Sequence, residues 1–190
     1  CSSDLMLLRG SPSERRRFMD LTLSVVNRDY YTAIRDLHRG IAGRNRLLKN
    51  NGSAAELSAF EAEIAPHASQ IANYREVGMR TLSEVLCRTY DRIAEADEGP
   101  KLSFRPNVDC HDTEAYCRLL YESRKRDRMI GATQRGPHRD DFNFSLQVGG
   151  AREYASDGQQ RGLCVALQIA QASFYRQQLG LVPVLSLIHI

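Results

Sequence analysis

The sequence predicts a mixed α/β fold, in which a helical hairpin precedes a segment that joins a β-hairpin to a long helix. Two patterns predict it. Apolar residues recur at helical spacing through most of residues 11–98. Apolar and polar residues then alternate strictly over residues 142–148, and Gly149-Gly150 and a second helical pattern follow.

Length and composition exclude several classes of protein. The 190 residues are 42% hydrophobic and 26% charged, which is ordinary for a globular domain and excludes intrinsic disorder and collagen-like structure. No stretch approaches the roughly 20 apolar residues of a membrane helix, and the first residues do not resemble a signal peptide. We therefore expect no membrane partner. The chain begins with Cys1 rather than Met, which predicts that it starts inside a longer one.

Cysteine usage favours a reduced, cytoplasmic protein without a metal site. The 5 cysteines are odd in number and form no Cys-x-x-Cys pair, so zinc-ligand spacing is absent. His138 lies near Asp140 and Asp141, but no second ligand cluster accompanies them. We expect residues 136–141 to form a tight, ion-paired turn rather than a metal site.

Charge is unevenly distributed although the net charge is only +3. Arg15-Arg16-Arg17 is the densest basic run, and these residues are candidates for contact with DNA or with another domain. Successive residues point about 100° apart around a helix, so the three cannot all face one partner. We favour the alternative in which one Arg pairs within the protein and two face solvent.

Capping patterns predict where the first two helices begin and end. Ser11-Pro12-Ser13-Glu14 has capping-box spacing, with Pro at the first helical position. This helix should break at Asn27-Arg28-Asp29. A second helix should begin near Asp29, because one apolar stripe follows at helical spacing. Its members are Tyr30, Ile34, Leu37, Ile41 and Leu48.

A turn at Asn50-Asn51-Gly52 and a capping box at Ser53-Ala54-Ala55-Glu56 predict the partner helix of the hairpin. Two long helices joined by a short turn form an antiparallel hairpin. Pro66 should bend the second helix, since proline removes a backbone hydrogen bond. Its apolar pattern comprises Leu57, Phe60, Ile64, Ile71, Tyr74, Leu82, Val85, Leu86 and Ile93.

The rest of the chain should alternate strands with helices. Residues 101–108 predict a short strand with Leu102 and Phe104 on one face. Asp112 should cap a helix that ends near Gly131. Apolar residues expected on that helix are Tyr116, Leu119, Leu120 and Met129.

The last third should hold a β-hairpin and a long helix. The strand over residues 142–148 should turn at Gly149-Gly150 and return over residues 152–155. A helix should then run from Ser156 to Gly180, and residues 182–185 should form a buried strand.

The start of that last helix, Ser156-Asp157-Gly158-Gln159-Gln160-Arg161, is the most informative motif. Backbone N–H groups and the helix dipole favour an anion there, and glycine lets another backbone come close. An ordinary Ser-capped helix explains Ser156 and Gly158 but leaves the Gln pair unexplained. Both interpretations are open on these residues alone.

Four stretches resemble the RecF family of bacterial DNA replication and repair proteins. Tyr154–Arg161 resembles that family's ABC-type signature. Order and spacing agree from residue 1 to about residue 185, which makes the set far more specific than any single motif. The other stretches are Gly10–Asp20, Arg44–Leu48, and Arg126-Asp127-Arg128 with Gly136–Asp141.

The resemblance implies a fragment of an ABC-type ATPase head, like the heads of SMC and Rad50 proteins, with an antiparallel helical arm. Residues 1–10 would form the edge of the head and residues 11–98 the arm. Residues 99–135 would return to the head as a strand and a helix. Residues 136–190 would be the head segment with the β-hairpin and the signature helix.

The resemblance also implies a function for the intact protein. It would bind DNA in an ATP-dependent way and act in recombinational repair, replication-fork maintenance and the SOS response. It would bind single-stranded or gapped DNA, dimerise on ATP and act with RecO and RecR to load a recombinase. ATP and Mg²⁺ would be its cofactors.

By the same resemblance, Ser156, Gly158 and Gln159 would contact the γ-phosphate of ATP held by the opposite subunit. Asp157 stands where many ABC signatures have Gly, and an acid beside a phosphate is unfavourable unless it points away.

The sequence departs from the family at both ends. It has no GxxxxGK[ST] motif and no acidic pair after Val182-Pro183-Val184-Leu185. We therefore expect a middle fragment that is inactive alone, followed by non-native residues 186–190. The alternatives are the head of another SMC-like or Rad50-like ATPase and a non-enzymatic helical interaction module. A phosphate-binding loop upstream of Cys1 would exclude the helical module.

Overall fold

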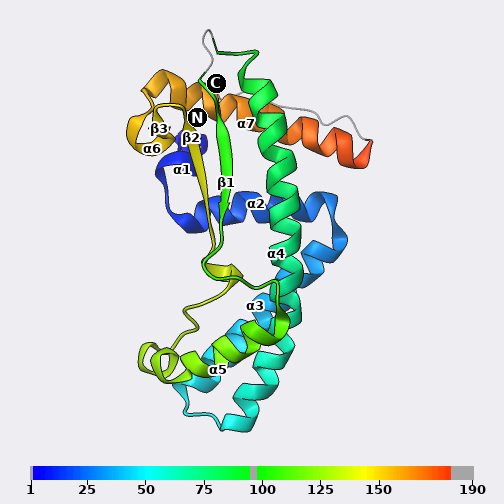
Figure 1. Ribbon diagram of the computed structural model, residues 1–190, viewed down its shortest axis with the longest axis vertical. Helices are drawn as coiled ribbons and strands as arrows, with labels where there is room; N and C mark the ends of the chain where they lie inside the picture. The colour runs from blue at the N-terminus through cyan, green and yellow to red at the C-terminus, as the bar shows by residue number, and fades with distance from the viewer. Residues whose placement is uncertain (1, 95–97, 181–190) are drawn as a thin grey trace. The chain divides into compact units, whose positions relative to one another are not determined.

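The computed structural model describes residues 2–94 and 98–180 of the chain (Figure 1). They belong to two compact units. Unit 1 comprises Cys1–Val26, Glu76–Arg105 and Asp141–Ile190, and unit 2 comprises Asn27–Arg75 and Pro106–Asp140. The helix α4 (Ala54–Tyr90) contributes residues to both units.

Unit 1 contains α1 (Ser2–Arg9), α2 (Pro12–Val26), the C-terminal part of α4, a small sheet, α6 (Ala151–Tyr154) and α7 (Asp157–Leu179). The helix start predicted at Ser11 is confirmed, because the Glu14 carboxylate accepts a hydrogen bond of 2.7 Å from the Ser11 N–H. The helix predicted to end at Gly180 also ends there, with that glycine in the left-handed region (φ 66°).

The sheet has three antiparallel strands in the order β1 (Lys101–Arg105), β2 (Asp141–Leu146) and β3 (Gly149–Gly150). Lys101 pairs with Ser145 and Phe104 with Phe142, so the two long strands lie side by side in Figure 1. Alternating burial along β2 confirms the predicted half-buried strand. Its buried side chains are Phe142, Phe144 and Leu146.

Two details of the predicted β-hairpin are wrong. Gly149-Gly150 is the returning strand rather than the turn. The return strand predicted over residues 152–155 is wrong, because residues 152–154 belong to the helix α6. The strand predicted over residues 142–148 ends earlier than expected, because β2 stops at Leu146. Val148, beyond that end, is 59% exposed. Two paired glycines have no side chains to extend the alternating pattern, so the pattern did not identify them as strand.

Unit 2 is built on the predicted antiparallel helical hairpin. It pairs α3 (Arg28–Lys49) with the N-terminal part of α4, and the capping box of Ser53 and Glu56 starts α4. A Cβ added at Gly40 would lie 2.7 Å from Ile64, and one added at Gly43 would lie 2.3 Å from the ring of Phe60. The two helices therefore approach closely because these positions are glycine.

The remaining elements of unit 2 largely follow the prediction. Asp112 caps α5 (Thr113–Ile130) and Gly131 ends it, as predicted, and a short 3₁₀ turn covers Pro137–Arg139. All five members of the apolar stripe on α3 are buried. Met129 was expected inside but is 83% exposed. The helix α4 continues through Pro66, and the bend expected there stays a prediction.

Two further expectations concern the ends of predicted elements. Ile93, predicted as part of the long apolar pattern, lies beyond the end of α4 and is 43% exposed. The buried strand predicted over residues 182–185 lies outside the described residues.

Candidate functional site

Ser156 caps the first turn of α7. Its Oγ accepts a hydrogen bond of 3.2 Å from the backbone N–H of Gln159, and the Gln159 Oε1 accepts one of 2.8 Å from the Ser156 N–H. This reciprocal arrangement is a capping box. It fixes both the serine hydroxyl and the backbone of the signature motif at the start of a helix of 23 residues.

Two backbone donors point out of this helix start. The first N–H groups of an α-helix have no acceptor within the helix. Ser156 satisfies the N–H of Gln159, and the Gln160 N–H bonds to the Ser156 carbonyl at 2.9 Å. Among the described residues, the N–H groups of Asp157 and Gly158 have no acceptor, and the positive end of the helix dipole lies beside them. These groups could receive an anion.

The absent side chain of Gly158 leaves room beside these donors. A Cβ added there would meet, among the described residues, the Ser156 Oγ at 3.9 Å, which is an ordinary van der Waals contact. Neighbouring protein atoms therefore do not require glycine at this position. A group that approaches the backbone from outside would require it.

The carboxylate of Asp157 forms an ion pair with the guanidinium of Arg9, the last residue of α1. Arg9 also donates from Nε to the Oε1 of Gln160 at 2.6 Å. One arginine thus counters the acid of the signature and holds the neighbouring glutamine. The acid beside the predicted phosphate position is therefore balanced by a cation of unit 1.

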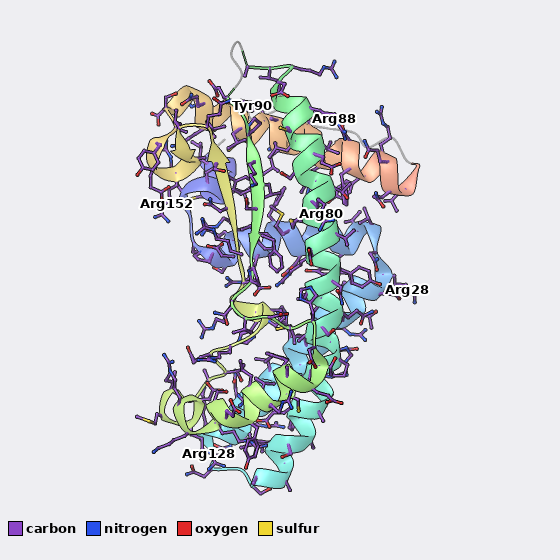
Figure 2. All side chains as sticks on the ribbon, viewed as in Figure 1. Arg28, Arg80, Arg88, Tyr90, Arg128 and Arg152 are labelled. Atoms are coloured by element: carbon purple, nitrogen blue, oxygen red, sulfur yellow. The ribbon has the colours of Figure 1, made fainter. Side chains whose placement is uncertain are left out.

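Both glutamines of the motif have structural partners in unit 1. The Gln159 Nε2 donates to the Glu98 Oε1 at 3.0 Å, and Glu98 also accepts a hydrogen bond from Tyr90, which is labelled in Figure 2. The Gln160 side chain is 4% exposed and donates to the carbonyls of Ala151 and Ala155. A capped helix therefore accounts for the Gln pair, contrary to expectation.

Arg15, Arg16 and Arg17 have three different surroundings. Arg15 is 8% exposed, and its Nε and Nη2 donate to the two carboxylate oxygens of Asp141 at 2.8 and 2.9 Å. Arg16 is half-buried and Arg17 is exposed. Arg15 therefore forms an ion pair within unit 1, and we expected one arginine of the run to pair within the protein.

This ion pair changes the acidity of Asp141. Burial alone would raise the pKa of the carboxyl group. The hydrogen bonds from Arg15 and from the Phe142 N–H act in the opposite direction and hold that pKa below its ordinary value. Asp141 is therefore a carboxylate at neutral pH, and the pair fastens the start of β2 to α2.

Comparison with known proteins supports the resemblance. No protein-family model matches the chain. It is 36% identical over 188 residues to the DNA replication and repair protein RecF of Moorella thermoacetica, which covers 97% of this chain and 50% of the relative. The RecF proteins of Symbiobacterium thermophilum and Herpetosiphon aurantiacus are 34% and 32% identical over 97% of this chain, and the match covers 52% and 49% of them.

This chain is similar to RecF. A solved structure of the recombination mediator protein RecF with ATP matches its fold with a TM-score of 0.88 and 23% identity, over 97% of this chain and 52% of that one. The expected mixed fold of helices and a small antiparallel sheet is confirmed, because it matches the fold of that RecF structure. The chain spans about half the length of the RecF relatives that it matches.

Two RecF-like stretches meet in a buried charge network of unit 2. The guanidinium of Arg44 is fully buried and contacts Asp127 at 2.7 Å and Glu61 at 3.1 Å. It also donates to the Thr133 Oγ1 and the Leu120 carbonyl, each at 2.8 Å. The network links α3, α4 and α5 to the segment after Gly131.

A second buried pair holds the turn at Pro137–Arg139. Arg75, fully buried, donates to the Asp140 Oδ2 and to the Pro137 carbonyl, both at 2.7 Å. Asp140 also accepts from the Asn107 N–H at 2.8 Å. The predicted ion-paired turn is confirmed in unit 2.

The sequence contained a signal for both buried arginines. Arg44 lies three residues after Ile41 and four before Leu48, so it continues the buried stripe of α3. Arg75 stands four residues after the buried Ile71. An arginine on an apolar helical stripe indicates a buried ion pair, because a lone buried charge is very unfavourable.

Metal-ligand clusters and membrane-spanning helices are both missing from the described part of the chain. Within residues 2–94 and 98–180, no three His, Cys, Asp or Glu side chains gather as metal ligands. Over the same ranges, no helix is both long and apolar enough to span a bilayer.

Proposed function

We propose that this chain is the signature-bearing part of a RecF-type, ATP-dependent DNA replication and repair protein. The observation that carries the proposal is similarity to RecF proteins over 97% of the chain. The similar region includes the start of α7, where backbone N–H donors and Gly158 are accessible. The solved RecF structure with the matching fold is a RecF–ATP complex, which supports ATP as the nucleotide.

In this proposal, ATP binds between two copies of the intact protein. Each copy would hold its nucleotide with a phosphate-binding loop, which this chain lacks. The other copy would supply Ser156, Gly158 and Gln159. The donors best placed for the γ-phosphate are the Ser156 hydroxyl and the N–H groups of Asp157 and Gly158, because the Gln159 amide contacts Ser156 and Glu98.

DNA binding and the partner proteins belong to the same proposal. The intact protein would bind single-stranded or gapped DNA, dimerise on ATP with Mg²⁺, and act with RecO and RecR in recombinational repair and the SOS response in the cytoplasm. Two kinds of relative support it. The matching solved structures are of RecF as a recombination mediator of the RecFOR pathway, and the curated relatives are DNA replication and repair proteins.

The test replaces Ser156 with Arg in the protein encoded by the gene's complete reading frame. A guanidinium would fill the space of the phosphate and remove an aimed donor, whose loss typically costs about 10²–10³ in rate. ATP affinity should stay nearly unchanged, because the phosphate-binding loop of the same copy is untouched. ATP-driven dimerisation and turnover should fall strongly.

The matched control is Ser53→Arg, because Ser53 caps α4 in the same kind of capping box with Glu56. This variant loses a helix cap but should keep dimerisation and turnover. If Ser156→Arg behaves like Ser53→Arg, Ser156 is only a helix cap and the proposed site is wrong.

A further inference from the structure

Two helix ends of unit 2 carry five exposed basic side chains. The helix α3 ends with Arg46 and Lys49, and α5 ends with Lys125, Arg126 and Arg128, which is labelled in Figure 2. We call these five residues the basic end.

Contacts between the two helices show that the basic end is one surface. A Cβ added at Gly131 would lie 3.2 Å from the Cγ of Lys49, so the lysine stem covers the end of α5. Arg128 donates to the carbonyl of Gly52 at 2.7 Å, in the turn that follows α3. The N–H of Thr133 donates to the Asn45 Oδ1 at 2.7 Å.

The exposed charge of this surface is more positive than the summed charge of the segments that form it, because folding buries their one acid. Asp127 is the one acid in residues 45–52 and 125–135. It is fully buried and pairs with Arg44. Residues 126–128 thus present two arginines outward while their aspartate turns inward. The acids closest in sequence are Glu122, one turn earlier on α5, and Glu56, which caps α4.

Helix dipoles explain part of this arrangement. Cations in the last turn of a helix are favourable, and Arg46, Lys49 and Arg128 lie there. Lys125 and Arg126 lie farther from the end of α5, and the dipole effect falls off within the last turn. A cluster of five exposed cations with the intervening acid buried fits a polyanion.

We propose that the basic end binds the phosphate backbone of duplex DNA without reading its base sequence. The inference rests on the proposed function, which includes gapped DNA as a partner, and adds the surface that contacts the duplex part of that DNA. Duplex is favoured over single strands, because residues 45–52 and 125–135, which form this surface, contain no aromatic side chain on which unpaired bases could stack. Lysine and arginine contacts to phosphates act through charge and release of counterions.

The test measures binding of the 190-residue chain to a fluorescent duplex of random sequence between about 50 and 200 mM NaCl. The variant Arg46→Gln, Lys125→Gln, Arg126→Gln removes three exposed charges but leaves Lys49 and Arg128, which contact neighbouring segments. Affinity should fall by about tenfold or more, and the slope of log K against log salt should become shallower by about 3.

The matched control removes three exposed basic charges from unit 1: Arg88→Gln, Arg92→Gln, Lys101→Gln. It has the same net charge as the first variant, so a general effect of charge would weaken both equally. The inference predicts that this control variant binds the duplex with nearly the affinity and the salt slope of the unchanged chain. Circular dichroism of both variants shows whether either has lost its helices.

Each other outcome overturns the inference. Equal losses in the two triple variants would show unspecific attraction, and no binding of the duplex at about 50 mM NaCl would show that the basic end does not bind DNA. Competition by poly-glutamate as effective as by DNA would indicate an acidic protein partner. None of these outcomes touches the proposed ATP site, which the Ser156→Arg experiment tests separately.

Discussion

Arg9 and Asp157 form an ion pair between the last residue of α1 and the first residue of α7. The pair is partly exposed, with side chains that are 45% and 79% accessible, so its contribution to stability is small, about 0.2–1 kcal/mol. The position of the pair matters more than its strength. Arg9 neutralises the charge of Asp157 at the helix start where the proposed function places a phosphate.

The first prediction concerns this compensation in the intact protein. Arg9→Ala should weaken ATP-driven dimerisation, because the Asp157 carboxylate then faces the phosphate without a counter-charge. The double variant Arg9→Ala, Asp157→Asn should regain most of the dimer, since it removes the repulsion. Sedimentation with and without ATP measures both. A double variant as defective as Arg9→Ala would show that Arg9 acts through Gln160 instead.

The second prediction concerns the buried network around Arg44. Arg44→Ala should destabilise the chain by about 3–5 kcal/mol, because Asp127 and Glu61 are left as buried charges without this partner. Urea unfolding measures the change. Arg46→Ala, two residues away and exposed, should change stability by about 0.5 kcal/mol or less. Similar losses in the two variants would contradict this account of the network.

Much of the fold could be predicted from local chemistry. The capping box at Ser53, the helix start at Ser156 and the stripe on α3 are short-range patterns, and the structure confirms them. The hairpin turn and Met129 were misassigned for a physical reason. Glycine carries no side-chain pattern, and an apolar residue in the last turn of a helix can face solvent when packing does not reach it.

The site was predicted less completely than the fold. The motif around Ser156 identified the helix start and its donors. The ion pair of Arg9 with Asp157 joins residues 148 positions apart, and no local pattern connects them. The partners of Gln159 and Gln160 are Glu98 and the carbonyl of Ala151 in α6. Their positions could not be predicted, because α6 was expected to be a strand.

The third prediction separates stability from function at Gly158. Gly158→Ala should stabilise the isolated chain by up to about 1 kcal/mol, because the position is helical and a methyl group meets ordinary contacts there. In the intact protein the same methyl group would occupy the proposed phosphate approach, so ATP-driven dimerisation should decrease. Urea unfolding and sedimentation give the two results. A variant that dimerises normally would place the phosphate elsewhere.

The fourth prediction concerns pH. The pKa of Asp141 is lower in the folded chain than its ordinary value near 3.8. A depressed carboxyl pKa contributes stability above the unfolded pKa, and that contribution is lost as the pH falls through the folded pKa. Wild-type stability should therefore decline below about pH 4 more steeply than that of Asp141→Asn. Parallel profiles from about pH 6 downward would contradict the role of the Arg15 pair.

The most direct measurement mixes two inactive variants of the intact protein. One carries Ser156→Arg, and the other lacks the lysine of the proposed phosphate-binding loop, whose motif is absent from these 190 residues. A mixed dimer then has one complete site, with the loop of the first copy and the signature of the second. If copies pair at random, turnover should return to about a quarter of the wild-type rate. A mixture as inactive as its components would contradict a signature that acts across the dimer.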